Sequence, residues 1–356
     1  MSLKRIIKHR EIWMGLSILW IVFFHSGLDV SGQLLEGIKW CGYGGVDVFF
    51  FASGIGCFYS LQKDNGALNF IKRRMVRIIP TYWAFMIVWL VFQRMQNDMS
   101  RSVMLGNLFG VRQFTGLEDG FNWYISAMWL MYFLAPLFKE IVDKIDTIGK
   151  AFMVVVFLVV FTVCFWCAGA YIIMVTRIPI FFIGMLMGKC AWNDVSISRK
   201  GIVALTVIMI AGFQVLRYFR DAHGELLWDK GFYWYPFILI TPGLCVIISV
   251  IMEMLNSNIR NVIARIIGIP GKYSFEIYLL HIWLFEDLMG WLRKKDMISG
   301  GNTGWWQAIL LLIPACLVLR LVSKLILRLL ESVIGQMDKE YIIYKKIKEK
   351  NEQDRK

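Results

Sequence analysis

Long apolar runs recur along the chain and are separated by short polar stretches. A helix of about 20 residues crosses a hydrocarbon core of roughly 30 Å, and the runs match that length. The pattern therefore predicts an all-α, polytopic integral membrane protein with about ten transmembrane helices. They are expected near residues 11–28, 42–61, 78–95, 121–138, 151–170, 172–189, 201–219, 233–252, 268–290 and 305–323.

Composition supports a membrane protein over a soluble one. Hydrophobic residues make up 58% of the 356 residues and charged residues only 18%, whereas soluble domains are about half apolar and about a quarter charged. The first apolar run leads directly into a second one without a small-residue cleavage site, so it is predicted to remain as a first span. Most of the seven cysteines lie inside apolar runs, which argues against a secreted disulfide framework.

The charge pattern predicts an orientation. Lys and Arg gather at the N-terminus, at the C-terminus and in alternate loops, and such loops face the cytoplasm. Both termini are thus expected in the cytoplasm and the protein in the cell membrane. The formal charge of +13 follows mainly from this topology, and no motif predicts a nucleic-acid partner.

Two parts are expected in the chain: a membrane domain at 1–330 and a basic cytoplasmic tail at 331–356. The tail is equally compatible with a solvated helix and with attraction to anionic membrane lipids. The CxxC of Cys164 and Cys167 has no second cysteine pair, so no metal site is predicted. The sequence does not indicate an oligomeric state.

Three ionisable side chains fall at one predicted depth. At 1.5 Å per residue, His25 in the first span and His281 in the ninth each lie roughly 20 Å from the inner edge. Asp47, near the outer end of the second span, lies at a similar level. Such a group predicts a polar cavity in which a carboxylate orients an imidazole base. Taken singly, each residue is explained as well by a buried polar group bonded to backbone.

The short inner stretch "NFIKRRMVRIIPTYW" gathers Lys72, Arg73, Arg74 and Arg77 before a span that is expected to start near Pro80. Arg73 and Arg77 are one helical turn apart. Two guanidinium groups at that spacing suit a phosphate or diphosphate. The alternative is a topology-setting cluster that meets lipid phosphates.

Two further stretches combine small and polar residues. "GVDVFFFASGIGC" holds Gly44, Gly45, Gly54 and Gly56, which permit close helix approach. "GKYSFEIYLLH" places Ser274, Glu276 and His281 at one span entrance, a polar density that a purely structural span rarely carries.

In this order, these stretches resemble the integral membrane acyltransferase family 3, which includes O-acetyltransferases of bacterial surface polysaccharides. The resemblance rests on His25 closing the first span, on "GVDVFFFASG", on "RRMVRIIPTYW" and on "GKYSFEIYLLH". It covers residues from about 8 to 330. It implies an acyl-CoA donor, usually acetyl-CoA, and an acceptor hydroxyl on an envelope glycan across the membrane.

The resemblance implies that His25 is catalytic and that Arg73 and Arg77 contact the donor, with Arg74 beside them. Two positions depart from the family. Met14 stands where members commonly carry an arginine, although Arg10 lies one turn earlier, and Met128 stands where many carry a glutamate.

The resulting hypothesis is acyl transfer through the membrane. His25 acts either as a general base or as a nucleophile that forms an acyl-histidine, and Asp47 or Glu276 orients an imidazole. Tyr82 and Ser274 are expected to line the donor path. Two alternatives stay open: a transporter or flippase of a lipid-linked or small polar substrate, and an inactive family member.

Overall fold

The computed structural model describes residues 1–64, 66–96, 100–115, 123–167, 173–229 and 231–353. For 115, 166–167, 223–229 and 331–353 it describes the backbone only. Within this part of the chain every regular element is a helix, and one isolated antiparallel bridge joins Ser2 to Ser196. The predicted all-α class is confirmed.

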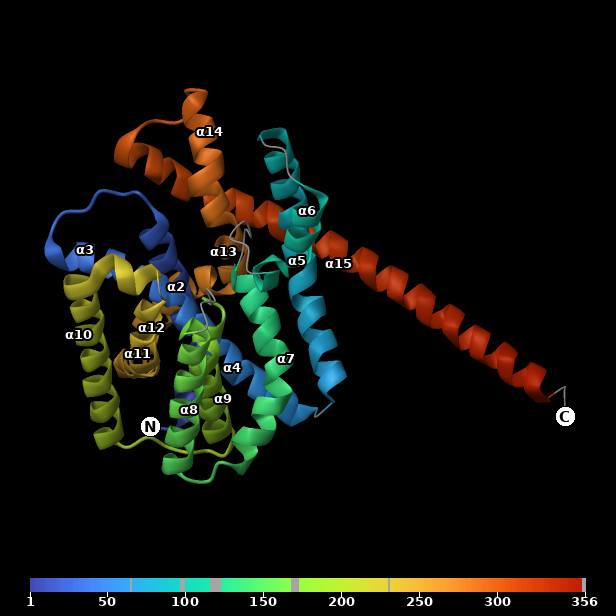
Figure 1. Ribbon diagram of the computed structural model, residues 1–356, viewed down its shortest axis with the longest axis horizontal. Coiled ribbons are helices and arrows are strands. Elements are labelled where there is room, and N and C mark those ends of the chain that lie inside the picture. The colour runs from blue at the N-terminus through green and yellow to red at the C-terminus, as the bar shows by residue number, and fades with distance from the viewer. Residues whose placement is uncertain (65, 97–99, 116–122, 168–172, 230, 354–356) are drawn as a thin grey trace.

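The helical elements follow one another along the whole chain (Figure 1). In order they are α1 (Leu3–Lys8), α2 (Arg10–His25), α3 (Gln33–Trp40), η1 (Cys41–Gly44), α4 (Gly45–Lys63), α5 (Ala67–Gln96), α6 (Arg101–Leu108), η2 (Arg112–Thr115), α7 (Trp123–Lys144), α8 (Ile148–Cys167), η3 (Val175–Arg177), α9 (Ile178–Trp192), α10 (Arg199–Asp229), η4 (Phe232–Trp234), α11 (Pro236–Met254), α12 (Ser257–Lys272), α13 (Ser274–Ile282), η5 (Trp283–Leu288), α14 (Met289–Lys294) and α15 (Gly301–Gln353).

Eight helical stretches of the described residues are long and apolar enough to cross a membrane, where the sequence predicts ten. Two predicted spans differ. The span at 11–28 is α2, which has only 16 residues and ends at His25. The span at 268–290 is divided, because α12 ends at Lys272 and α13 continues into the π-helical turn η5. Parts of the spans predicted at 121–138, 151–170 and 172–189 lie outside the described residues.

One end of the bundle gathers the N-terminus and the connections α7–α8 and α9–α10 (Figure 1); we call it the basic end. The N-terminal amine donates to the Ile197 carbonyl at 2.8 Å, and Lys4 pairs with Asp194 at 2.7 Å. The Lys189 ammonium donates to the carbonyls of Val142, Asp143 and Ile145. The three hydrogen bonds of Lys189 thus satisfy free carbonyls at the end of α7 and just after it. Which side of a membrane this end faces stays a prediction.

Helix α4 forms the centre of the bundle and packs against α2, α7, α9 and α11. A Cβ on Gly54 would lie 2.1 Å from the Phe181 carbonyl oxygen, and a Cβ on Gly184 would lie 2.2 Å from that of Phe51. The backbones of α4 and α9 therefore touch directly. Such contact requires glycine on both helices.

The segment α6–η2 folds back between α5 and α7. Four consecutive carbonyls, those of residues 107–110, accept hydrogen bonds from side chains of these two helices: Tyr82, Trp83, Trp129 and Ser126. Irregular backbone at membrane depth requires such partners. The sequence predicts only a connection between two spans here, and the structure forms it from the short helix α6 and the 3-10 turn η2. Tyr82, expected on the donor path, instead donates to the Asn107 carbonyl.

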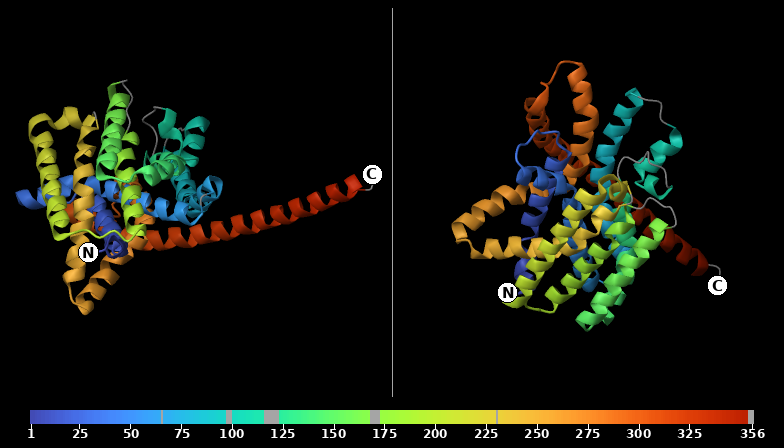
Figure 2. Two further views of the ribbon diagram at one scale, coloured as in Figure 1. Left: turned by 90° about the horizontal axis from the view of Figure 1, so that it is seen from below. Right: turned by 60° about the vertical axis from the view of Figure 1, so that its left-hand side comes forward.

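The C-terminal part of α15 extends away from the bundle (Figure 2), whereas its first part packs against α5 and α13. Its described side chains alternate between buried ones such as Leu312 and exposed apolar ones such as Leu321 and Leu325. The side chains of the basic tail predicted at 331–356 lie outside the described part, so that tail stays a prediction.

We expect Gly54→Ala to lower the free energy of unfolding by about 1–3 kcal/mol, because the new methyl group forces α4 and α9 apart. Gly37→Ala is the matched control. A Cβ on Gly37 meets nothing within 4 Å, and removing glycine from a helix is neutral or stabilising. Denaturant unfolding in one detergent measures both. Equal stability of the two variants would contradict the direct backbone contact.

We expect Tyr82→Phe to destabilise the protein by about 1–3 kcal/mol, because it removes the buried hydrogen bond that the Tyr82 hydroxyl donates to the Asn107 carbonyl. Tyr273→Phe serves as control, since the Tyr273 ring lies under Arg320 and a phenyl ring keeps that contact. The same unfolding assay compares them. A Tyr82→Phe midpoint equal to that of Tyr273→Phe would show that the segment is not held by this hydrogen bond.

Candidate active site

A cavity of about 960 Å³ opens at the basic end, between α1, α2, α4, α5, α7 and α13. Its size is in the range of small-molecule sites. The lining is strongly unbalanced in charge. Glu11 is the one acidic residue in it, against eight basic residues: Lys4, Lys8, Arg10, Lys63, Arg74, Arg77, Lys272 and Arg320.

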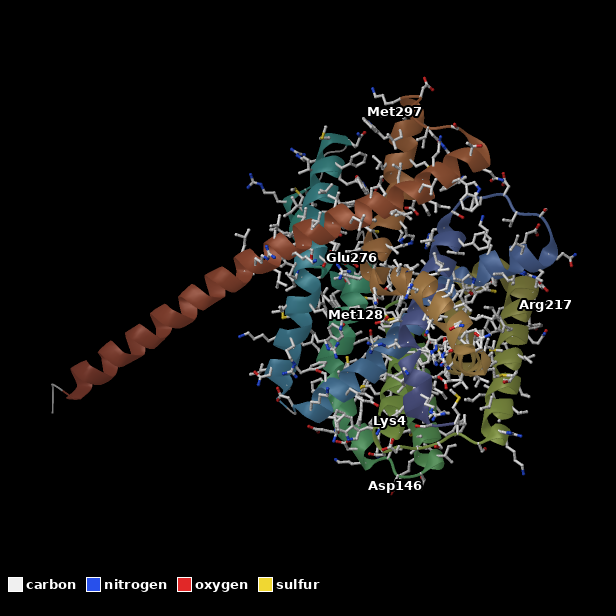
Figure 3. All side chains as sticks on the ribbon, turned by 180° about the vertical axis from the view of Figure 1, so that it is seen from behind. Lys4, Met128, Asp146, Arg217, Glu276 and Met297 are labelled. Atoms are coloured by element: carbon white, nitrogen blue, oxygen red, sulfur yellow. The ribbon has the colours of Figure 1, made fainter. Side chains whose placement is uncertain are left out.

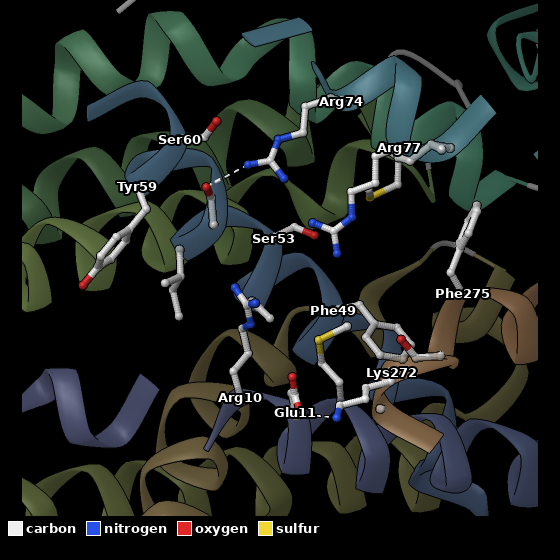
Figure 4. A pocket seen from close by; sticks show the side chains of 18 of the residues that line it. Arg10, Glu11, Phe49, Ser53, Tyr59, Ser60, Arg74, Arg77, Lys272 and Phe275 are labelled. Atoms are coloured by element: carbon white, nitrogen blue, oxygen red, sulfur yellow. Dashed lines mark hydrogen bonds and ion pairs between the residues drawn. The ribbon is translucent and has the colours of Figure 1, made fainter. Parts of the chain in front are cut away.

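Arg10, Arg74 and Arg77 point toward one another across the cavity (Figure 4). Arg74 donates to the Gly56 carbonyl at 2.7 Å, and its guanidinium lies 5.6 Å from the Tyr132 ring centroid. A Cβ on Gly56 would lie 3.6 Å from Arg10 Nη1 and 3.9 Å from Arg74 Nη2. Gly56 thus leaves space in the cavity beside two arginines, whereas Gly54 allows α4 to pack closely against α9.

The basic charges are only partly compensated. Lys272 lies 3.8 Å from Glu11 (Figure 4). Arg320 lies 3.9 Å from Glu276. Arg10 and Arg77 form no ion pair with any described residue. Unpaired guanidinium groups held close together bind anionic oxygens, especially phosphate, through paired N–H groups.

Arg73, predicted to pair with Arg77, faces a different direction. The stretch expected as an inner loop is the start of helix α5, and its residues 74, 77 and 78 face the cavity. Arg73 Nη1 instead donates to Asp64 at 2.5 Å. This hydrogen bond holds the pKa of the Asp64 carboxyl below its usual range.

Three other polar residues of the predicted set lie apart from the arginine group. Ser274 lines the cavity at the first turn of α13. Tyr82 lines a separate apolar pocket of about 250 Å³ between α5, α6 and α7. Glu276 is buried on α13 and faces Arg320 on α15, not an imidazole.

The cavity ends at a layer of tyrosines. Tyr124 and Tyr278 both line it, with ring centroids 4.5 Å apart. On its other side Tyr278 contacts His281, at 5.3 Å between centroids. One aromatic layer therefore separates the basic cavity from the histidines, and neither histidine lines the cavity itself.

His25 and His281 are in ring contact, with centroids 5.0 Å apart and an interplanar angle of 67°. His25 is the last residue of α2 and is partly exposed, whereas His281 is completely buried. The Nδ1 atom of His281 lies 2.7 Å from the Tyr278 carbonyl oxygen and 3.2 Å from that of Ile277. Neutral imidazoles in such contact can accept and hold a proton from a hydroxyl group.

Asp47, expected beside the histidines, forms its ion pair elsewhere. Its Oδ1 lies 3.7 Å from Arg177 Nε, and both side chains are buried. The Arg177 guanidinium lies 3.3 Å from the Trp234 ring centroid and 5.0 Å from that of Trp123. Removing one member of such a buried pair is strongly destabilising. We interpret Asp47 as a residue that holds η3 against α4.

The two methionines that depart from the family pattern, Met14 and Met128, both line the cavity. Met128 is buried in the interior of the bundle, while Lys4 and Asp146 mark the basic end (Figure 3). Both departures therefore fall in the lining of the same cavity.

Several cavity residues were not predicted from the sequence: Lys8, Lys272, Tyr124, Tyr278 and Arg320. One signal was present. Gly271, Ser274, Phe275 and Tyr278 follow the helical spacing of three and four residues, and all face the cavity. For Arg320, far away in sequence on α15, no local pattern predicts a place in the cavity.

Comparison with known proteins identifies a family for the chain. The chain matches the family model described as an acyltransferase domain over residues 13–323, which cover seven of the eight candidate membrane spans of the described residues completely and most of the eighth. Neither a curated protein nor a solved structure matches it. The protein therefore belongs to the membrane-embedded acyltransferase family 3.

Proposed function

We propose that this membrane acyltransferase moves an acyl group from cytoplasmic acyl-CoA to a hydroxyl of a cell-surface polysaccharide or another envelope glycan. Acetyl-CoA is the expected donor. The observation that carries the proposal is the cavity at the basic end, where eight cationic side chains face one carboxylate. A cavity of this charge favours a ligand with several phosphates.

Coenzyme A fits the chemistry of this lining. It carries a diphosphate and a third phosphate on one end and a thioester on the other. In the proposal Arg10, Arg74 and Arg77 bind the phosphates, and the basic end faces the cytoplasm, where acyl-CoA is made. The Gly56 position leaves room for a phosphate between two guanidinium groups, because no side chain fills it.

The thioester end of the donor is expected to pass between Tyr124 and Tyr278. These rings are in contact, so the proposal requires that they move apart when the donor binds. His25 then takes the proton of the acceptor hydroxyl while the oxygen attacks the thioester carbonyl. The partly exposed edge of His25 suits an acceptor that arrives from the side opposite to the basic cavity.

The proposal predicts that cells with the wild-type protein carry acyl groups on envelope glycans that cells with His25→Ala lack. General base catalysis contributes about 10² to 10⁴-fold to rate, so the variant should be almost inactive. Mass spectrometry of glycans and lipids detects the acetyl increment of each sample. Identical spectra, with both proteins present in the membrane at equal amount, would refute transfer to an envelope acceptor.

We expect Arg74→Gln and Arg77→Gln each to weaken acetyl-CoA binding about ten- to hundredfold, because each removes a charge-assisted hydrogen bond of about 1.5–3 kcal/mol. Arg73→Gln is the matched control. It removes the same charge from the same helix, but Arg73 bonds Asp64 and does not line the cavity. Titration calorimetry of the purified protein compares the three. An equal loss for Arg73→Gln would indicate a general charge effect.

A further inference from the structure

The surroundings of His281 determine which of its two ring nitrogens carries a hydrogen. A carbonyl oxygen only accepts hydrogen bonds, so the Nδ1 atom that lies against the Tyr278 and Ile277 carbonyls must carry a hydrogen. In a neutral imidazole the other nitrogen, Nε2, is then a bare acceptor. This atom is buried and has no hydrogen-bond partner among the described residues.

A buried acceptor without a donor is rare in folded proteins, and its presence calls for an explanation. Among the described residues, three rings contact His281: those of Tyr278, Phe285 and His25. Phenylalanine has no donor. Tyr278 carries a hydroxyl donor, but this hydroxyl forms no hydrogen bond with His281 Nε2, and Tyr278 lines the basic cavity. The His25 ring, at 5.0 Å between centroids, supplies an N–H group of the required kind.

We propose that His281 is a positioning residue for His25, whose ring N–H donates to His281 Nε2 in the reacting state. The inference rests on the proposed acyl transfer. A small rotation of the partly exposed His25 ring closes this hydrogen bond, whereas the buried His281 ring is held by two carbonyls. The bond places the hydrogen of His25 on the nitrogen that faces His281. It leaves the other nitrogen bare for the acceptor hydroxyl.

The proton movements balance within this arrangement. The bare nitrogen of His25 takes the proton of the acceptor hydroxyl, and the oxygen forms a bond to the thioester carbon. The carbon–sulfur bond breaks, and the departing thiolate takes the proton from the His25 imidazolium. Throughout these steps His281 keeps its Nδ1 hydrogen and accepts from His25, so it stabilises the imidazolium without taking up a proton. His281 therefore replaces a carboxylate as the group that orients His25. In agreement with this, Asp47 forms an ion pair with Arg177, and Glu276 forms one with Arg320.

Two substitutions of His281 distinguish a role in positioning His25 from a role in packing. His281→Phe keeps the ring and removes the acceptor. His281→Gln keeps an amide oxygen near the place of Nε2, although it loses the ring. We expect His281→Phe to lower kcat about 10²-fold or more, with an unchanged KM for acetyl-CoA, and His281→Gln to recover a substantial part of kcat. A purely structural role predicts the opposite order, because Phe fills the space better.

The assay uses the full-length protein in detergent, with acetyl-CoA as donor and methyl glucoside or water as acceptor, and follows thiol release. In the background of His25→Ala, His281→Phe should cause no further loss, because a positioning residue acts only through the residue it positions. A further loss in the double variant, or full activity of His281→Phe, would overturn the inference.

A failure of the proposed function and a failure of this inference give different experimental results. If the wild-type protein neither binds nor cleaves acetyl-CoA, the proposed function is wrong and this inference falls with it. If the wild type is active and His25→Ala is not, while His281→Phe is active, the function stands and only the inference is wrong. Acetyl-CoA binding by each variant, measured by calorimetry, serves as the control for a folded protein.

Discussion

The direct contact between the backbones of α4 and α9 is the constraint on which the rest of the bundle depends. Gly54 and Gly184 allow each helix to meet a main-chain carbonyl of the other. In hydrocarbon, helix association relies on such close packing, since there is no water to exclude from the interface. With α4 held in the centre, its two ends make different contributions to the structure. Asp47 pairs with Arg177 near the start, and Gly56 opens the cavity near the end.

The position of α4 also explains how a strongly basic cavity exists inside an apolar bundle. Charged side chains are costly in hydrocarbon unless they face a cavity or a partner. Here they gather at one end, where Lys4, Lys8 and Lys63 come from the ends of helices and the arginines extend inward from α2 and α5. Tyr124, Tyr278, Met14 and Met128 line the same cavity. Toward the histidines its wall includes the aromatic ring of Tyr278, which contacts His281.

Much of the fold follows from the sequence, because runs of about 20 apolar residues admit few structures other than spanning helices. The predicted depths placed His25 and His281 together, and their rings are in contact, although the predicted span 268–290 is divided and α13 begins only at Ser274. The depth prediction failed for Asp47, whose partner Arg177 belongs to the short helix η3 and has no signal in the local pattern. The choice between Arg73 and Arg74 depends on which face of α5 meets the bundle. Spacing alone does not determine that face, because both residues share a turn with Arg77.

The back-folded segment α6–η2 shows another limit of sequence patterns. The sequence shows only a connection between two spans there, because the groups that satisfy its carbonyls are side chains on α5 and α7. Tyr82 and Trp83 look like interfacial aromatic residues when only their own helix is considered. Their function as donors to a folded-back backbone becomes visible only when the two helices and the segment are seen together.

The central claim is that the basic cavity holds the charged end of an acyl donor whose reactive end reaches the histidine pair through the tyrosine layer. The most direct measurement is an experimental structure of the full-length protein with a non-hydrolysable acetyl-CoA analogue. We expect its phosphates beside Arg10, Arg74 and Arg77, with the Tyr124 and Tyr278 rings apart and the acyl carbon beside His25. Phosphates bound elsewhere, or an acyl group that stops at an intact tyrosine layer, would contradict the account.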